Sequence, residues 1–339
     1  MKDTFTQEQL LFVVSPPRSG STLLQRMLGS HTAIGTHPEP HIITPLAHLG
    51  FDGIVDAAPY DHINSAEAIK LFVDHLPNKE HDYYDSLRSY TDGLYGKMLR
   101  TMPEKSVFMD KTPAYALVLP FLARLYPSAK YVVLTRHPLA VFSSFANSFF
   151  EGDWAAAHAF NPLVERYVPA MAKFLRDKPA PYVHVSYETL VRQPEAELER
   201  VFGYLGLEHQ PEAANYGDRF DGSKQGPGDP IGVHQHSRPV AASVEKWAEE
   251  LAHDEKKLAL ARRMIDSVSD DDLATWGTPR AELWKPLESA GGGKPPKRVV
   301  NSYTLQRRVF LALRKDIDKR PHGKLLRKVK YYCDVLLRE

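Results

Sequence analysis

Apolar residues in this chain form short continuous runs separated by longer stretches with helical spacing. Leu10–Val14, Tyr131–Leu134 and Tyr182–Val185 are runs typical of buried parallel strands, and Ser106–Met109 is a weaker fourth. Helical spacing covers Thr22–Ser30, Ala66–Leu76, Asp85–Met102, Ala114–Tyr126, Pro138–Phe150, Pro162–Asp177, Pro194–Leu205, Ser243–Glu250 and Asp254–Ser267. Strands that alternate with helices in this way predict an α/β fold, a doubly wound parallel sheet flanked by helices.

Two segments interrupt this alternation. Asp218–Pro239 is rich in Gly, Pro, Asp and His and has no period, which is typical of a long loop such as a lid. Gly291–Lys297 combines a glycine run with proline and lysine, which indicates a linker. Beyond it, Leu305–Leu313 and Lys324–Leu337 have amphipathic helical spacing and predict a C-terminal helical extension.

Charge is divided unevenly along the chain. The 43 Lys and Arg nearly balance the 42 Asp and Glu, but residues 294–339 hold 14 basic and 4 acidic residues, a net charge of +10 against −9 for the rest. A basic tail on an acidic body predicts an anionic partner, such as an acidic carrier protein, an anionic membrane surface or the body of the same chain. The alternative is a solvated helical face. We expect a main domain over 1–290 and a basic helical tail over 291–339.

Cysteine usage and the N-terminus bear on the compartment. Cys333 is the only cysteine, so no disulfide can form within the chain, which is typical of a reducing environment. The first residues lack a signal-peptide pattern, and no segment approaches the roughly 18 apolar residues of a membrane span. We expect a cytoplasmic protein, at most peripheral to a membrane.

Pro16–Leu24, directly after the first strand, carries the clearest chemical signal. An apolar strand that feeds a Gly/Ser loop opening a helix directs N–H donors at an anion, and Arg18 adds a full positive charge. The loop is not a Walker A motif, because no Lys follows Gly20. A kinase would also need carboxylates to hold Mg²⁺, whereas a sulfonate carries less charge, so protein cations suffice. The alternatives are a P-loop nucleotide kinase or NTPase, and a non-catalytic nucleotide-binding module.

A second cationic motif runs from Arg136 to Ser144. Arg136 directly follows an apolar strand, and Pro138 is suited to the first turn of a helix that places Ser144 about two turns in. A strand-end guanidinium and a helix hydroxyl can hold a second phosphate.

Together the two motifs resemble those of PAPS-dependent sulfotransferases, whose donor is 3′-phosphoadenosine 5′-phosphosulfate. The resemblance covers roughly residues 8–250 and implies a P-loop-like α/β fold, PAPS as co-substrate and no metal. It implies donor contacts from Arg18, Ser19, Gly20, Ser21, Thr22 and Leu23 at the phosphosulfate and from Arg136 and Ser144 at the 3′-phosphate. It further places Tyr187 of Tyr187–Leu190 near the adenosine and Lys246 near the phosphates.

The acceptor side rests on the same resemblance. Glu39 has the spacing of the proposed base in the tyrosylprotein branch, and Pro38–Leu49 is similar to bacterial domains that act on β-hydroxyacyl chains in polyketide pathways. Lys111 resembles the family lysine that contacts the bridging oxygen, and with Arg18 it would stabilise the leaving group. The proton acceptor stays open, since a histidine is the alternative base: His41, His234 or His236.

The sequence therefore predicts a sulfotransferase that moves a sulfuryl group from PAPS to a hydroxyl of a small-molecule or carrier-bound acceptor. Aromatic residues in 66–102 and 150–167 favour an apolar or extended acceptor. No nucleic-acid partner is expected, and the scattered histidines lack metal-ligand spacing.

Overall fold

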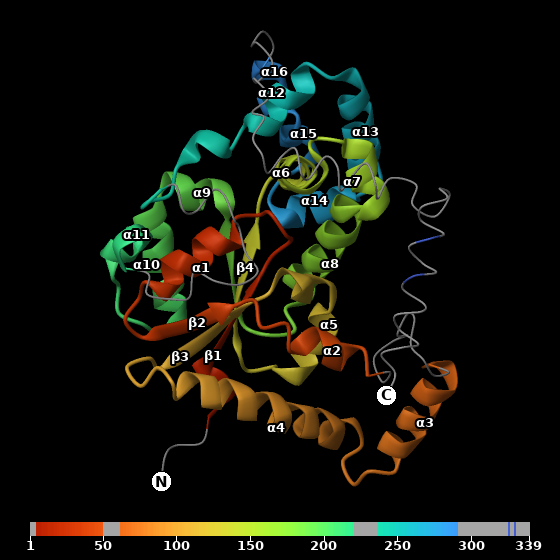
Figure 1. The fold of residues 1–339 in the computed structure, drawn as a ribbon, viewed down its shortest axis with the longest axis vertical. Coiled ribbons are helices and arrows are strands. Elements are labelled where there is room, and N and C mark those ends of the chain that lie inside the picture. Colours follow the sequence, from red (N-terminus) through yellow and green to blue (C-terminus); the bar gives the residue numbers. More distant parts are fainter. Residues whose placement is uncertain (1–4, 50–61, 220–235, 291–324, 326–328, 330–339) are drawn as a thin grey trace.

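The computed structural model describes residues 5–49, 62–219, 236–290, 325 and 329 (Figure 1). Its centre is one parallel sheet of five strands in the order β2-β3-β1-β4-β5. The strands are β1 Leu10–Val14, β2 Ile34–Pro38, β3 Val107–Lys111, β4 Lys130–Thr135 and β5 Tyr182–Ser186. The predicted α/β fold with a doubly wound parallel sheet is confirmed.

Helices cover both faces of the sheet, because alternate strand residues point to opposite sides. Leu11 and Val13 of β1 belong to a core shared with the helices α1, α9 and α10. Leu10 and Phe12 belong to a larger core shared with α4, α5, α6 and α8 (Figure 1). The helices up to this point are α1 Ser21–Gly29, α2 Ile43–Ala47, α3 His62–Asp74, α4 Glu80–Leu99, α5 Leu119–Leu125, α6 Pro138–Phe150, α7 Trp154–Phe160, α8 Leu163–Asp177, α9 Tyr187–Arg192 and α10 Pro194–Leu205.

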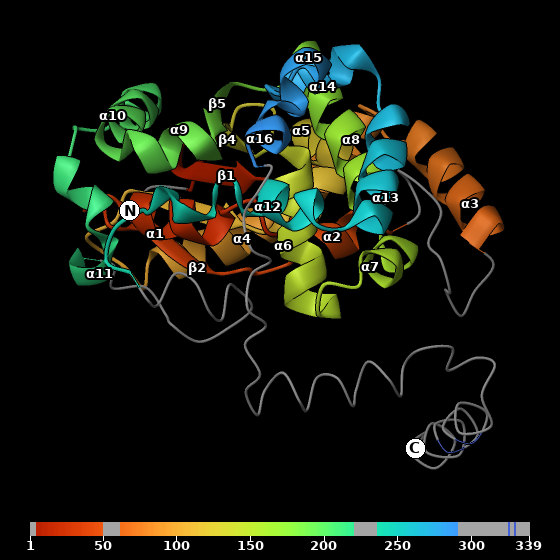
Figure 2. The ribbon, with the colours of Figure 1, turned by 90° about the horizontal axis from the view of Figure 1, so that it is seen from above.

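The C-terminal part of the described chain is helical and adds no strand to the sheet. α13 and α14 pack on α8, and α12 packs on α6, so this layer extends the larger core (Figure 2). The helices of this layer are α12 Lys246–Ala252, α13 Glu255–Asp266, α14 Asp270–Trp276, α15 Arg280–Leu283 and α16 Lys285–Ser289. The short helix α11 Tyr216–Arg219 lies beside α10 and belongs to the smaller core (Figure 1). Short 3₁₀ segments are η1 Gln7–Gln9, η2 Pro113–Leu117, η3 Pro211–Ala214 and η4 Ala241–Ser243.

Two local features differ from what the sequence pattern indicates. Residues Ile34–Pro38 have no strand pattern, yet they form β2 at one edge of the sheet; a proline is tolerated at an edge, where its missing N–H costs no ladder bond. The helix expected over Ala114–Tyr126 is broken at Val118 into η2 and α5, because Pro120 cannot donate a backbone hydrogen bond.

Several predictions fall on residues outside the described ranges. These are most of the lid Asp218–Pro239, the linker Gly291–Lys297, and nearly all of the tail helices. No helix in the described part of the chain combines the length and the apolar run that crossing a membrane requires.

Candidate active site

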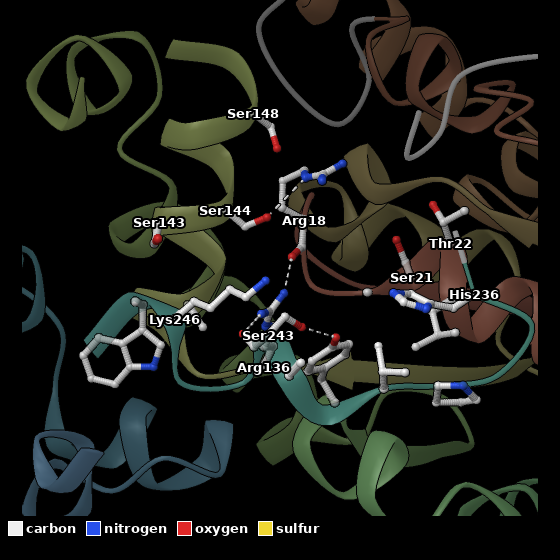
Figure 3. Close-up of a pocket in the computed structure, with 18 of the residues that line it drawn as sticks. Arg18, Ser21, Thr22, Arg136, Ser143, Ser144, Ser148, His236, Ser243 and Lys246 are labelled. Carbon is white, nitrogen blue, oxygen red and sulfur yellow. Dashed lines mark hydrogen bonds between the residues drawn. The ribbon is translucent and has the colours of Figure 1, made fainter. Parts of the chain in front are cut away.

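The carboxyl ends of β1 and β4 meet at one edge of the sheet, and a pocket of about 480 Å³ opens there (Figure 3). Nearly all the residues predicted to hold the sulfuryl donor line it: Arg18, Gly20, Ser21, Thr22, Leu23, Arg136, Ser144, Tyr187 and Lys246. Among the described residues that line the pocket, four are cationic (Arg18, Arg136, Arg238 and Lys246) and none is a carboxylate. The two motifs, over a hundred residues apart, therefore share one cationic cavity.

The loop before α1 has an unusual backbone. Arg18 has φ +68° and Gly20 has φ +97°, both in the left-handed region. Such residues form concavities lined by N–H groups that bind anions. A side chain at Gly20 has no room, because its Cβ would lie 2.4 Å from Cδ2 of Tyr187. The glycine is required both by its conformation and by the close approach of this ring.

Arg136 is the most constrained cation of the pocket. It is 8% exposed, and its guanidinium donates to the carbonyls of Arg18 at 3.2 Å and Ser243 at 2.9 Å. Its Cζ lies 4.3 Å from the centre of the Tyr187 ring, and Tyr187 is held in turn by a 2.9 Å bond to the Ser243 hydroxyl. Its Nε is buried with no hydrogen-bond partner. Burial lowers the pKa of Arg136, but a guanidinium stays charged at any physiological pH.

The turn between β4 and α6 is fixed from two sides. The Glu188 carboxylate accepts the backbone N–H of His137 at 2.9 Å and the Ser186 hydroxyl at 3.0 Å. The Trp276 indole donates to the Arg136 carbonyl at 2.9 Å. These bonds set the start of α6, and the Ser144 hydroxyl then lies 3.4 Å from Nε of Arg18. The role of Glu188 in this turn was not foreseen from the sequence.

His137 is held as a neutral imidazole. Its ring stacks on Trp247 with centroids 4.1 Å apart, and Nε2 donates to the Leu283 carbonyl at 3.0 Å. Burial lowers the pKa of His137 to about 4. As the pH falls below 6.5, the imidazole becomes protonated in the unfolded chain but stays neutral in the folded chain. The neutral His137 therefore contributes fully to the stability of the fold above pH 6.5, and this contribution is lost as the pH falls toward 4.

We expect the free energy of unfolding to drop by about 2 kcal/mol between pH 7 and pH 5 because of His137. Urea unfolding of the wild type and of His137→Phe at both pH values checks this, since the phenyl ring keeps the stacking but cannot titrate. An equally steep pH dependence in the variant would contradict the assignment.

A second polar cluster lies at the ends of β2 and β3. Pro38 pairs with Lys111 in the sheet, and this register brings the next residue, Glu39, to the lysine. The Lys111 ammonium, 1% exposed, donates to Oε1 of Glu39 at 2.5 Å, and Nε2 of His41 lies 3.6 Å from Oε2. The structure thus brings together three of the predicted catalytic residues, although none of them lines the cationic pocket.

The chain around Glu39 is anchored from behind. Tyr115 donates to buried Asp110 at 3.0 Å and accepts the backbone N–H of Ile43 at 3.2 Å. Gln25 of α1 donates to the Thr36 hydroxyl at 2.9 Å and so ties β2 to the helix that follows the loop. Burial raises the pKa of Asp110, although its hydrogen bonds oppose the shift.

Of the other predicted site residues, His236 lines the pocket and Ser19 does not. Ser19 is fully buried, does not line the pocket, and donates its hydroxyl to the Pro16 carbonyl at 2.8 Å. His236 lines the pocket beside Ser21 and Thr22 (Figure 3). His234 lies outside the described residues. Within the described ranges, no group of three or more His, Cys, Asp or Glu side chains is placed to hold a metal ion.

The segment 236–243 closes one side of the pocket, and the sequence indicated His236 here but not the contacts of Arg238 and Ser243. Arg238 bonds to Asn215 at 2.9 Å and forms an ion pair with Glu195, which ties the segment to the body. The Ser243 carbonyl and hydroxyl bond to Arg136 and Tyr187. No period or motif marks these residues, since their contacts are all long-range.

Fold and site define an α/β protein with a cationic pocket at the carboxyl edge of a parallel sheet. Residues 11–211 match the model of the sulfotransferase family. The chain belongs to that family, and the resemblance drawn from its motifs is confirmed.

The chain is also similar to individual proteins and solved structures. The nodulation protein NoeE of Sinorhizobium fredii is 27% identical over 218 residues, which cover 59% of this chain and 50% of NoeE. A putative protein-tyrosine sulfotransferase of Caenorhabditis briggsae is 23% identical over 62% of this chain and 69% of its own length. Among solved structures, the sulfotransferase domain of the Synechococcus PCC 7002 olefin synthase is 25% identical with a TM-score of 0.48, over 76% of this chain and 94% of that domain. The chain thus spans half the length of NoeE.

Proposed function

We propose that the protein transfers a sulfuryl group from PAPS to a hydroxyl group. The observation that carries this is the joining of two anion-binding motifs in one pocket, where Arg136 donates to the Arg18 carbonyl at 3.2 Å. A donor with phosphate groups on both the 5′ and the 3′ side of its ribose matches two cationic ends. A magnesium nucleotide needs carboxylates to hold the metal, and the described residues that line this pocket include none.

The two ends of the pocket divide the donor between them. The loop Arg18–Leu23 and the N-terminus of α1 would hold the 5′-phosphosulfate, because their N–H groups have no partner within the helix. Arg136, Ser144 and Lys246 would hold the 3′-phosphate; the unpartnered buried Nε of Arg136 supports this assignment. The ring of Tyr187 stacks on the Arg136 guanidinium and packs against Gly20. Tyr187 would then lie near the adenosine, as the family resemblance implies.

The reaction follows from the second cluster. The acceptor oxygen attacks the sulfur while the bond from sulfur to the bridging phosphate oxygen breaks, and 3′-phosphoadenosine 5′-phosphate (PAP) leaves with the electron pair. Glu39 takes the acceptor proton, with His41 or His236 as the alternative base. The ammonium of Lys111 and the guanidinium of Arg18 stabilise the charge that builds on the leaving oxygen. The pairing of Lys111 with Glu39 at 2.5 Å supports their placement at one reacting centre.

The acceptor and the tail complete the proposal. The ring of Phe149 is 43% exposed and lies 6.0 Å from Cζ of Arg18, so an apolar surface borders the cationic pocket. This supports a hydroxylated acceptor with an apolar part. The charge of +10 over residues 294–339 supports a separate basic tail that meets an acidic carrier protein or an anionic membrane surface.

Two measurements on the wild-type protein test the function. Calorimetry should show PAP bound about 10²- to 10³-fold more tightly than AMP, because buried charged contacts to the 3′-phosphate contribute roughly 3–4 kcal/mol. Labelled PAPS should then pass its sulfate to members of a panel of hydroxylated acceptors. Equal affinity for PAP and AMP, or magnesium-dependent ATP hydrolysis without sulfate transfer, would overturn the proposal in favour of an NTPase.

A further inference from the structure

One carboxylate outside the predicted motifs connects four helices around the pocket. Glu250 of α12 accepts the hydroxyl of Ser143 at 2.5 Å and the amide of Asn147 at 3.1 Å, both from α6. It also accepts the indole N–H of Trp154 on α7 at 3.1 Å and the ammonium of Lys257 on α13 at 2.6 Å. Both oxygens of this carboxylate are therefore occupied by donors from other helices.

These bonds hold the two walls of the cationic pocket at a set distance. Ser144 lies on α6, and Lys246 begins α12 one helical turn before Glu250. Both side chains line the pocket, and Lys246 reaches toward Arg136 (Figure 3). Because Glu250 is bonded to the residue next to Ser144, its carboxylate fixes where these two anion-binding groups stand relative to each other.

The charge of Glu250 does not oppose an anion in the pocket. Lys257 forms an ion pair with it at 2.6 Å, and the Glu250 side chain is only 13% exposed. The pair is neutral as a unit, so its effect on a bound phosphate is geometric. The negative charge of Glu250 instead strengthens the hydrogen bonds from its four donors, since bonds to an ionised acceptor are shorter and stronger than bonds to a neutral one.

We propose that Glu250 is a positioning residue for the 3′-phosphate side of the pocket, acting through Ser143 on α6 and through its own helix on Lys246. This inference rests on the proposed function, because it assumes that a 3′-phosphate lies between Ser144 and Lys246. It also separates the two adjacent serines: the Ser143 proton is donated to Glu250, so Ser144 is the hydroxyl left to donate to the phosphate.

The test is the ratio of PAP affinity to AMP affinity in wild-type and variant proteins. Calorimetry measures both affinities without acceptor and without PAPS. Glu250→Gln keeps the shape but turns one oxygen into an NH₂ group that must face a donor, so the links to α6 or to Trp154 and Lys257 are lost. We expect the ratio to fall about tenfold. A general loss of stability would weaken both ligands equally and leave the ratio unchanged. In turnover, KM for PAPS should rise while KM for the acceptor stays constant.

Glu165→Gln is the matched control. Glu165 of α8 accepts a hydrogen bond from His158 of α7 at 2.6 Å and does not line the pocket, so Glu165→Gln should leave the ratio at the wild-type value. Ser143→Ala removes the other end of the connection and should also lower the ratio. In the double variant Glu250→Gln/Ser143→Ala the two effects should not multiply, because one connection is cut twice.

Different results would contradict the positioning role of Glu250 and the proposed function. An unchanged ratio in Glu250→Gln, or multiplied effects in the double variant, overturns the positioning role. Should Glu250→Gln fail to fold, the ratio in Ser143→Ala decides alone. A wild-type protein that does not prefer PAP over AMP instead refutes the proposed function, so the two failures are distinguishable.

Discussion

Arg136→Ala is expected to weaken PAP binding by about 10²- to 10³-fold while AMP binding falls by much less. Arg136 is 8% exposed and lines the pocket, so its charge is poorly hydrated, and a 3′-phosphate bound there gives it an ion-pair partner. Removing one partner of a buried, hydrogen-bonded charge pair costs about 2–5 kcal/mol, and each 1.4 kcal/mol is about tenfold in affinity. Calorimetry with the two nucleotides measures both losses.

Arg136→Lys distinguishes charge from geometry. A lysine supplies a point charge but cannot donate to the Arg18 and Ser243 carbonyls and still direct a planar group at the ligand. It should therefore recover only a small part of the PAP affinity. Thermal unfolding of both variants shows whether the loop remains folded. Arg136→Ala that binds PAP as well as the wild type does would remove Arg136 from the site.

The sheet was largely predictable because its central strands are continuous apolar runs. β1 and β4 were predicted within one residue at either end, since all or all but one of their residues are buried. β5, at an edge of the sheet, was predicted equally well because its buried residues, Val183 and Val185, are strong strand formers. β2 was not, because Ile34–Pro38 contains Gly, Thr, His and Pro and has a pattern neither of a buried strand nor of an alternating one. Its place is decided by pairing with β3, a tertiary contact.

Some residues of the candidate site could likewise be predicted from the sequence, and others could not. Arg18 and Arg136 follow strands directly, so local sequence places them at the edge of the sheet where ligands bind in doubly wound folds. Arg238, Ser243 and Glu250 have no such marker, and each bonds to a residue far away in the sequence: 43 positions for Arg238 and 107 for Ser243 and Glu250. A carboxylate in an amphipathic helix looks like any solvated residue until its four donors are known. Motifs therefore revealed the groups proposed to touch the ligand and left out those that hold them.

Lys111→Met should lower kcat by about 10²- to 10³-fold and leave the affinity for PAP nearly unchanged. Lys111 is proposed to act on the leaving oxygen, where charge develops only in the transition state, and removal of one such donor costs this much in other enzymes. Methionine fills the volume of the lysine stem, which is needed because the side chain is 1% exposed. Single-turnover transfer of sulfate from labelled PAPS measures the effect. Unchanged kcat would exclude Lys111 from the reacting centre.

The partner of Lys111 separates catalysis from folding. Lys111→Met leaves Glu39, 13% exposed, without its 2.5 Å ammonium partner, and a carboxylate stranded in this way destabilises the fold. The double variant Lys111→Met/Glu39→Gln removes both charges and should regain stability, since burying a neutral amide costs much less free energy than burying an unpaired carboxylate. If the ion pair were only structural, activity would return with stability. We expect stability to return and activity to stay low, because neither the base nor the cation is restored.

Glu39→Gln alone should lower kcat about 10²-fold or more, whereas His41→Gln should not, and the reverse result would make His41 the base.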